Sequence, residues 1–494
     1  MTDQSQPNIV LIFTDNQQAS TLGCYGNSEI HTPHLDQLAG QGMLFENAFC
    51  PNGFCSPCRA SLMTGLLPSQ HGVHSWIDDR NMPEWPANWH ALKGLRTLPA
   101  TLQAAGYKTA LSGKYHLGDP TTKMDGFDSW CTMADGHVRS FYRNRITENG
   151  DNYDHEGHTV DFFTDKGIAF MKAQVAENTP FFLYLSYPAP YGHWPATKET
   201  DRCRYSKRYD DCPMLSIPRE GLSKASVDGF LMRQRYSGGG LDYSLTLRAP
   251  NDMATLRNYY AQISMVDDGV GQIMAALNRL GIADNTLLVF TSDHGLSVGH
   301  HGFWGHGAAT FPSNMHRAAH SVPLIVRHTP TVAAGVRSSA MVSNMDIYST
   351  LLDYTAQPEE QGNLAVASRT LKPALSGNAC EPHNGAVYAE QEETRVVRTA
   401  EWAYFKRFAD APGHPIGDEL YNVQTDPEEK NNLNDHPNYQ DIRHQLDDSL
   451  NSYFATHARK EADLWNGGTA LQHSERQAFW QNAWGSDWRP VYQY

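Results

Sequence analysis

Two continuous apolar segments that lie far apart in the chain each end in an acidic residue. Asn8-Ile-Val-Leu-Ile-Phe-Thr14 precedes Asp15, and Thr286-Leu-Leu-Val-Phe-Thr-Ser292 precedes Asp293 and His294. Continuous apolar runs of this length are typical of strands that are buried on both faces of a sheet. Because open α/β sheets bind ligands outside the carboxyl ends of their strands, we expect Asp15, Asp293 and His294 to mark a functional site.

Helix and strand patterns alternate between these two segments. Residues 32–42 begin with Thr-Pro and end with Gly, which predicts a short helix, and residues 97–106 repeat this pattern. Strands are predicted at 107–112 and 181–186, and the spacing of apolar residues predicts a long helix over 251–280. This alternation is typical of an α/β sheet.

The chain has 494 residues, which is too long for one ordinary small domain. We expect a large α/β domain over residues 1–365, a smaller α+β domain with an antiparallel sheet over 366–455, and an extension over 456–494 that packs on the body or on a neighbouring subunit. This division depends on three short alternating segments and four tryptophans: residues 386–390, 394–399 and 402–408, and Trp465, Trp480, Trp484 and Trp488.

The charge balance limits the partners. With 39 Lys and Arg against 54 Asp and Glu, the formal charge is −15, which has the wrong sign for attraction to nucleic acid. An anionic substrate therefore needs a local basic pocket. Residues 1–7 lack the features of a signal peptide, and the apolar runs are too short to span a membrane, so we expect a cytoplasmic protein with no membrane partner. The eight cysteines are expected to be mostly reduced thiols, although their even number permits a bridge.

Residues 196–250 show weaker periodicity than their surroundings and are interpreted as an inserted loop region. They carry a cluster of basic residues that favours a solvated face, with a lid over the substrate as the alternative. The cluster consists of Arg202, Arg204, Lys207 and Arg208.

The segment Phe54-Cys-Ser-Pro-Cys-Arg-Ala-Ser-Leu-Met-Thr-Gly65 carries the most specific local motif. Cys55 and Cys58 resemble a redox dithiol or half of a zinc site, but no other cysteines form the second pair that a zinc site needs. The pattern Cys-x-Pro-x-Arg instead leads into a helix. It puts Cys55 at the helix N-terminus beside Arg59, where an anionic nucleophile or a bound anion is favoured.

On this motif and three others, the sequence resembles the type I sulfatases of the alkaline phosphatase superfamily. The others are Gly106-Tyr-Lys-Thr-Ala-Leu-Ser-Gly-Lys-Tyr-His116, Thr291-Ser-Asp-His-Gly295 and the C-terminal pieces of residues 418–433. They occur in the expected order, and the likeness to the family extends over residues 8 to about 433. The resemblance implies a large, mostly parallel mixed sheet sandwiched by helices, with a smaller C-terminal antiparallel sheet.

The resemblance also implies a metal centre and a modified residue. Cys55 would be converted to formylglycine by a maturation enzyme, and the hydrated aldehyde would be the nucleophile. Calcium is the expected metal, but because His294 is a softer ligand than the Asn often found there, manganese or magnesium stays an alternative. The implied ligands are Asp15, Asn16, Cys55, Asp293 and His294.

Five further roles follow from the resemblance. Asp293 would be the base for the first hydroxyl group of the hydrate, leading to a covalent sulfo-enzyme intermediate. Arg59 and Lys114 would supply positive charge to the sulfuryl oxygens. His116 would take the proton from the remaining hydroxyl group, and His193 would protonate the leaving alkoxide.

Residue 306 departs from the family pattern. In many relatives a sulfate-binding lysine follows the Trp-Gly pair, whereas here Trp304-Gly305 is followed by His306. If His306 occupies that place, anion binding should depend on protonation of the histidine. The alternatives are residues nearby that could fill the vacancy: His316, Arg317 and His320.

The expected activity is hydrolysis of a sulfate monoester, of a sugar or oligosaccharide first and of an aryl or alkyl group next. The nearest rival enzyme is a phosphonate monoester or phosphodiester hydrolase of the same superfamily. A zinc phosphodiesterase is a different rival, but it would need Ser or Thr as nucleophile. The non-enzymatic rival is a binding protein with an unconverted Cys55, and a homo-oligomer is compatible with the sequence. Four tryptophans could stack on sugar rings or belong to the core: Trp76, Trp85, Trp89 and Trp194.

Overall fold

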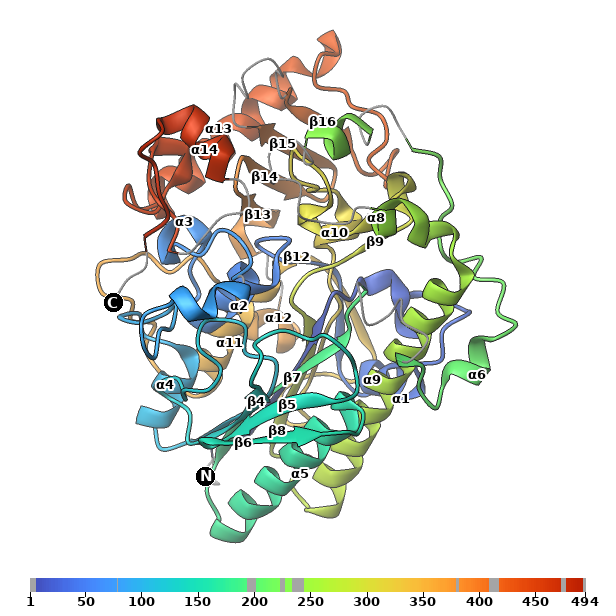
Figure 1. Ribbon diagram of the computed structural model, residues 1–494, viewed down its shortest axis with the longest axis vertical. Helices are drawn as coiled ribbons and strands as arrows, with labels where there is room; N and C mark the ends of the chain where they lie inside the picture. The colour runs from blue at the N-terminus through green and yellow to red at the C-terminus, as the bar shows by residue number, and fades with distance from the viewer. Residues whose placement is uncertain are drawn as a thin grey trace.

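The computed structural model describes residues 6–77, 79–192, 201–222, 227–232, 244–378, 382–407, 417–471 and 477–491. Its centre is a ten-stranded sheet of order β12-β2-β11-β8-β1-β7-β3-β4-β5-β6 (Figure 1). These strands are β1 Asn8–Asp15, β2 Met43–Phe49, β3 Lys108–Gly113, β4 Ser129–Met133, β5 Asn144–Glu148, β6 Asp151–His155, β7 Phe181–Pro190, β8 Thr286–Ser292, β11 Leu324–Arg327 and β12 Val336–Ser343.

The strand register aligns the two acidic strand ends. β1 pairs in parallel with both β7 and β8, and Thr14 lies opposite Ser292. The next residues, Asp15 and Asp293, therefore emerge at the same edge of the sheet. β3 extends the parallel core, β11 runs antiparallel to β2 and β8, and β4, β5 and β6 form an antiparallel edge. The predicted strands at 8–14, 107–112, 181–186 and 286–292 are confirmed.

Helices cover both faces of this sheet, because successive side chains of β1 point to opposite sides. Val10 and Ile12 face a core built with helices α1, α5 and α9. Ile9, Leu11 and Phe13 face a second core built with α2, α4 and α11. The helices of the described ranges include α1 Pro33–Gln41, α2 Cys55–Thr64, α3 Pro68–His71, α4 Leu98–Ala104, α5 Thr159–Glu177, α6 Ser206–Tyr209, α8 Ser244–Arg248, α9 Met253–Arg279, α10 Arg317–His320, α11 Ile347–Tyr354, α12 Lys372–Leu375, α13 Gln440–His457 and α14 Gln477–Trp484.

The predicted helices over 32–42, 97–106 and 251–280 are confirmed as α1, α4 and α9. Asp252 caps α9 by accepting a hydrogen bond from the Ala254 backbone N–H at 3.1 Å. Short 3₁₀ turns connect the elements: η1 Ala19–Thr21, η2 Gly23–Tyr25, η3 Asp79–Glu84, η6 Ala249–Asn251, η7 His300–Gly302, η8 Gly307–Ala309, η9 Asn344–Asp346, η10 Pro382–Gly385, η11 Pro437–Tyr439 and η12 Leu464–Asn466.

A second sheet follows in the C-terminal part of the chain, shown in orange to red at the top of Figure 1. Its four antiparallel strands are β13 Ala386–Gln391, β14 Thr394–Thr399, β15 Trp402–Arg407 and β16 Glu419–Asn422, and α13 packs against it. The three predicted strand segments are confirmed within the described residues. A small two-stranded sheet, β9 Ser297–Val298 and β10 Trp304–Gly305, lies in the loop after β8. The domain boundaries at 365 and 455 stay a prediction.

The tryptophan-rich extension packs on the body of the molecule. Trp480 and Trp488 are buried in a cluster with Leu464 and Phe311. The Trp488 Nε1–H donates to the carbonyl oxygen of Gly468 at 2.9 Å, which satisfies its buried polar group. The extension is therefore part of the folded unit.

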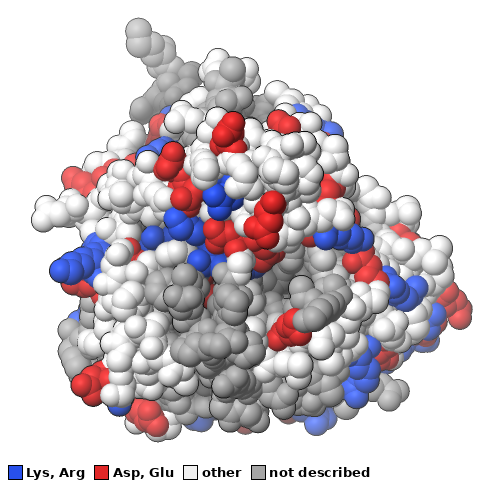
Figure 2. All heavy atoms as spheres, turned by 90° about the horizontal axis from the view of Figure 1, so that it is seen from above, with Lys and Arg blue, Asp and Glu red and all other residues white. Residues whose placement is uncertain are grey.

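Basic side chains of the insertion pair with acidic neighbours at the surface. Arg202 pairs with Asp210 at 2.6 Å and Arg204 with Asp161 at 2.7 Å, at exposed positions, which favours the solvated face for this part of the insertion. On the face drawn in Figure 2, acidic and basic side chains of the described residues are interspersed.

Within the described ranges, no helix combines the length and apolar character that crossing a membrane requires. The seven described cysteines form no disulfide bond.

The buried carboxyl group of Asp267 predicts a pH-dependent stability. It accepts hydrogen bonds from the backbone N–H groups of Leu35, at 2.7 Å, and His34, at 3.3 Å, and burial raises the pKa of Asp267 from 3.8 to about 7. The folded state thus holds a proton that the unfolded state has lost. The free energy of unfolding should therefore fall between about pH 4 and 7, by up to about 1.4 kcal/mol per pH unit.

Asp267→Asn cannot ionise, so its stability relative to the wild type should rise steadily across the same range. Urea denaturation at pH 5, 6 and 7 measures the difference between the two proteins. Parallel curves of stability against pH would contradict the expectation.

Candidate functional site

The predicted residues converge at the carboxyl edge of the central strands. Asp15 ends β1, Asp293 and His294 follow β8, and Cys55 begins α2. One ligand atom from each of these four buried residues lies within 4.8 Å of the others. Residues separated by up to 279 positions in sequence thus form one cluster.

Two buried cations balance the two carboxylates. Arg59 Nη2 lies 2.9 Å from Asp293 Oδ2 and 3.6 Å from Asp15 Oδ2, and Lys114 Nζ donates to Asp15 Oδ2. Burial alone would raise the pKa of the Asp293 carboxyl, but His294, Arg59 and Lys114 lower it to about 2. Asp293 is therefore ionised at neutral pH. The Arg59 guanidinium is held in turn by Ser186 Oγ, at 2.6 Å.

The Cys55 sulfur faces the cluster. Its Sγ lies 3.5 Å from Asp15 Oδ1 and 3.3 Å from His294 Nε2. Burial, followed by the charge of Asp15, raises the pKa of the Cys55 thiol well above its usual value, so the unmodified side chain is a neutral thiol and a weak nucleophile. His294 Nδ1 lies 2.8 Å from the Gly295 carbonyl oxygen, which can only accept, so Nδ1 carries a proton and Nε2 is the ring atom that faces the cluster.

Two amide side chains beside Asp15 are candidates for further ligands. The Asn16 backbone N–H donates to Asp293 Oδ1 at 3.1 Å, and Asn16 is fully buried at a positive φ of 61°. The side-chain amides of Asn16 and its neighbour Gln17 are buried without a hydrogen-bond partner among the described residues. A buried polar group without a partner is costly, so the orphaned Asn16 oxygen fits the predicted role of a cation ligand. The sequence did not single out Gln17.

His116 has one ring nitrogen engaged and one available. Nε2 lies 2.9 Å from the Ile77 carbonyl oxygen, which can only accept, so Nε2 carries the proton. Nδ1 is buried with no partner among the described residues. Burial, with the nearby charges of Lys114 and Arg59, lowers the pKa of His116 well below its usual value. The ring is therefore neutral, with Nδ1 as its proton acceptor.

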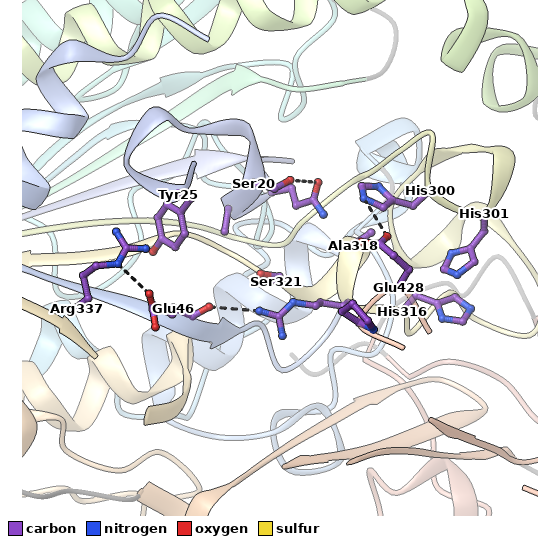
Figure 3. Close-up of a pocket in the computed structure, with 14 residues that line it drawn as sticks. Ser20, Tyr25, Glu46, His300, His301, His316, Ala318, Ser321, Arg337 and Glu428 are labelled. Atoms are coloured by element: carbon purple, nitrogen blue, oxygen red, sulfur yellow. Dashed lines mark hydrogen bonds and ion pairs between the residues drawn. The ribbon is translucent and has the colours of Figure 1, made fainter. Parts of the chain in front are cut away.

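His306 lies against the cluster. Its ring centroid is 5.1 Å from that of His294 and 5.6 Å from that of Phe54, and its Nδ1 accepts a hydrogen bond from the Ala308 backbone N–H at 3.1 Å. Two of the alternatives to His306 line a cavity to which none of the four cluster residues contributes. His316 and Arg317 line a cavity of about 280 Å³ with His300, His301 and Glu428, shown in Figure 3.

His320, the third alternative, lies with Nδ1 3.5 Å from Cys50 Sγ. The Cys58 thiol contacts the Asp293 carbonyl oxygen and the Asn344 side chain. His193 and Trp194 lie outside the described residues.

The other tryptophans that the sequence singled out differ in burial. Trp89 is buried and packs on Trp85 with ring centroids 5.1 Å apart, so these two belong to the core. Trp76 is half-buried, and its ring centroid lies 6.5 Å from that of His116.

The second sheet supports the loop before Cys55. Gln391 Oε1 accepts a hydrogen bond from the Gly53 backbone N–H at 3.0 Å, and Asn52 Nδ2 donates to the Glu390 carbonyl oxygen at 2.7 Å. The Glu390 backbone N–H donates to the carbonyl oxygen of Pro51 at 3.0 Å. Sequence reasoning missed these contacts, because no local pattern links residues that lie more than three hundred positions apart.

Two family comparisons bear on this site. The Sulfatase family model matches residues 7–357, and the model described as N-sulphoglucosamine sulphohydrolase, C-terminal, matches residues 304–456. The N-acetylglucosamine-6-O-sulfatase of Bacteroides thetaiotaomicron is 26% identical over 487 aligned residues, which cover 87% of this chain and 83% of that protein.

Solved structures share the fold. A protein in complex with its substrate D-glucosamine-2-N,6-O-disulfate is 24% identical, with a TM-score of 0.72 and coverage of 92% of this chain and 98% of that chain. The phosphonate monoester hydrolase of Agrobacterium radiobacter is 21% identical, with a TM-score of 0.71 and coverage of 92% and 96%. These likenesses confirm the predicted fold class, a large mixed and mostly parallel sheet of the alkaline phosphatase type with a small antiparallel sheet.

The buried charge balance predicts the effect of removing Arg59. Arg59→Met leaves the two buried carboxylates with too little positive charge, and in protein free of divalent cations it should lower the free energy of unfolding by about 3–5 kcal/mol. Added calcium should restore part of that loss because it supplies the missing charge. Thermal and urea denaturation with and without calcium measure both effects.

The matched control is Arg202→Met, which breaks an exposed ion pair with Asp210 and should cost no more than about 1 kcal/mol. Equal stability of the Arg59 and Arg202 variants would contradict the role given to the Arg59 charge.

Proposed function

This chain belongs to the sulfatase family and is a sulfuric ester hydrolase, and we propose that it cleaves the sulfate monoester of a carbohydrate. The observation that carries the proposal is the buried cluster of Asp15, Cys55, Asp293 and His294 with Arg59 and Lys114 beside it. The name of the N-acetylglucosamine-6-O-sulfatase of Bacteroides thetaiotaomicron supports a sulfated sugar as substrate. Aryl and alkyl sulfates are the next class.

The donor set suits a hard to borderline divalent cation. Carboxylate oxygens from Asp15 and Asp293, one imidazole nitrogen from His294 and the amide oxygen of Asn16 fit calcium first, with manganese or magnesium as alternatives. When bound, such a cation lowers the pKa of a neighbouring hydroxyl group and draws electron density from a sulfate oxygen.

The nucleophile requires modification of Cys55. The Cys55 thiol is neutral and buried and is therefore a weak nucleophile. Because the Cys-x-Pro-x-Arg motif resembles the first signature of the type I sulfatases, we infer that a formylglycine-generating maturation enzyme converts Cys55 to an aldehyde, whose hydrate offers two hydroxyl groups. The ionised carboxylate of Asp293 takes the proton from the attacking hydroxyl group. Arg59 and Lys114 stabilise the negative charge of the sulfuryl oxygens during transfer.

Two histidines complete the proton transfers. His116 Nδ1, which is neutral and has no partner among the described residues, accepts the proton of the second hydroxyl group when sulfate is expelled. His193, which lies outside the described residues, is proposed to protonate the leaving alkoxide. His306 is proposed to bind a sulfate oxygen in place of a lysine.

A panel of substrates tests the reaction. Protein produced together with the maturation enzyme should carry formylglycine at position 55, as measured by mass spectrometry of that peptide, and should hydrolyse at least one sulfated monosaccharide. Cys55→Ala and Asp293→Asn should each lower kcat/KM by about 10³-fold or more while thermal unfolding stays cooperative. Faster hydrolysis of phenyl phenylphosphonate than of every sulfate ester would favour the phosphonate monoester alternative. A plain thiol in protein from its native host would favour the binding protein.

The charge at position 306 gives a second test. His306→Lys supplies a permanent positive charge, and a hydrogen bond from a charged donor is the stronger kind, so inhibition by inorganic sulfate at pH 8 should tighten by about tenfold. The matched control is His444→Lys, which adds the same charge at an exposed position on α13 and should leave sulfate inhibition unchanged. Identical sulfate inhibition of the wild type and the His306 variant would contradict the proposed contact.

A further inference from the structure

A group of aromatic side chains, His137, Tyr191 and Trp76, lies beside His116, and the family motifs assign no role to it. The His137 ring centroid is 5.0 Å from that of His116 and 4.9 Å from that of Tyr191, with both pairs edge to face. The Trp76 ring centroid is 6.4 Å from that of His137. His137 comes from the loop between β4 and β5, a segment that none of the family motifs includes.

The hydrogen bond of His137 fixes its tautomer. Nδ1 lies 3.2 Å from the carbonyl oxygen of Val138, and because a carbonyl oxygen can only accept, Nδ1 carries the proton. Burial, followed by the charge of Lys114, lowers the pKa of His137 well below its usual value. The ring is therefore neutral, and Nε2 bears a lone pair that accepts hydrogen bonds.

This acceptor has no donor of its own. No described residue donates a hydrogen bond to Nε2 of His137, and 5% of the residue remains exposed. A buried acceptor of this kind gains most from a donor that a ligand brings.

The position of His137 ties it to the reacting group. Lys114 Nζ, which donates to Asp15, lies 5.3 Å from the centroid of the Tyr191 ring, and the Tyr191 backbone N–H donates to the Asp15 carbonyl oxygen at 3.0 Å. His137 packs on the same Tyr191 ring. The Tyr191 ring thus lies between His137 and Lys114, the cation that is proposed to hold the sulfuryl oxygens.

We propose, on the basis of the proposed sulfate ester hydrolysis, that His137 Nε2 accepts a hydrogen bond from a hydroxyl group of the leaving alcohol, with Trp76 as the apolar wall beside it. A neutral acceptor next to an aromatic wall suits the face of a sugar or polyol, which combines C–H surface with hydroxyl donors. An aryl or simple alkyl sulfate brings no such donor and leaves Nε2 unpaired. His137 thereby selects hydroxyl-bearing sulfate esters.

The contact is tested by a double-mutant cycle in which the enzyme loses the His137 nitrogens and the substrate loses one hydroxyl group. The matured wild type and His137→Phe are compared by kcat/KM on the best sulfated monosaccharide, on its monodeoxy analogues and on 4-nitrophenyl sulfate. Phe keeps the ring but removes both nitrogens. For the wild type, removal of one particular hydroxyl group should lower kcat/KM by about 5- to 150-fold, and His137→Phe should show the same loss on the full sugar but no further loss on that deoxy analogue.

Turnover of 4-nitrophenyl sulfate should stay within about twofold in His137→Phe, and His137→Gln, which offers an amide oxygen near Nε2, should recover part of the loss on the sugar. The matched control is His90→Phe, another histidine packed edge to face on a tyrosine, Tyr115, and it should leave the sugar preference unchanged. The proposal would be overturned if His137→Phe lowered kcat/KM equally on the sugar and on 4-nitrophenyl sulfate. It would also be overturned if the loss of kcat/KM from His137→Phe multiplied with the loss from the deoxy analogue, or if the wild type hydrolysed aryl sulfates alone.

The deoxy series on the wild type keeps the test valid if His137→Phe does not fold. Should the wild type hydrolyse phosphonate esters and no sulfate ester, the proposed function fails, and the same cycle with hydroxyl-bearing and hydroxyl-free phosphonate esters then decides the role of His137 by itself.

Discussion

The fold brings two carboxylates together out of water, and this is tolerated because two cations are buried with them. Asp15 and Asp293 sit at adjoining strand ends, and Arg59 and Lys114 reach them from α2 and from the end of β3. Isolated charges in such a place would be prohibitively costly. The balance keeps Asp293 ionised while the Cys55 thiol stays neutral. The same arrangement therefore stabilises the site and sets the protonation of its reacting groups.

The strand pattern determines where that balance forms. Because the side chains of β1 alternate between two cores, each face of the sheet carries its own layer of helices, and only the strand ends are left for polar chemistry. The register of β1 against β8 makes Asp15 and Asp293 neighbours, and α2 begins with Cys55 at the same edge of the sheet. A shift of this register would separate the carboxylates and remove the reason for burying Arg59.

Much of this could be predicted from the sequence, for physical reasons that differ by residue. Asp15, Asp293 and His294 follow apolar strands, and Cys55 begins a helix in a specific motif, so local patterns identify them. His306 was singled out only by its offset from Trp304-Gly305, and it is its position beside His294 that favours it over His316. His137 and Gln391 carry no local signal, because each gains its meaning from a tertiary neighbour, and His193 lies outside the described residues.

The hydrogen bonds between residues 51–53 and the end of β13 make the small sheet a structural part of the reaction centre. Glu390 and Gln391, which lie in the second sheet, form hydrogen bonds with residues 51–53, just before Cys55. Exchanging the second sheet for that of another family member would therefore displace the backbone just before Cys55. The second sheet and the segment before Cys55 are therefore expected to diversify as one evolutionary unit.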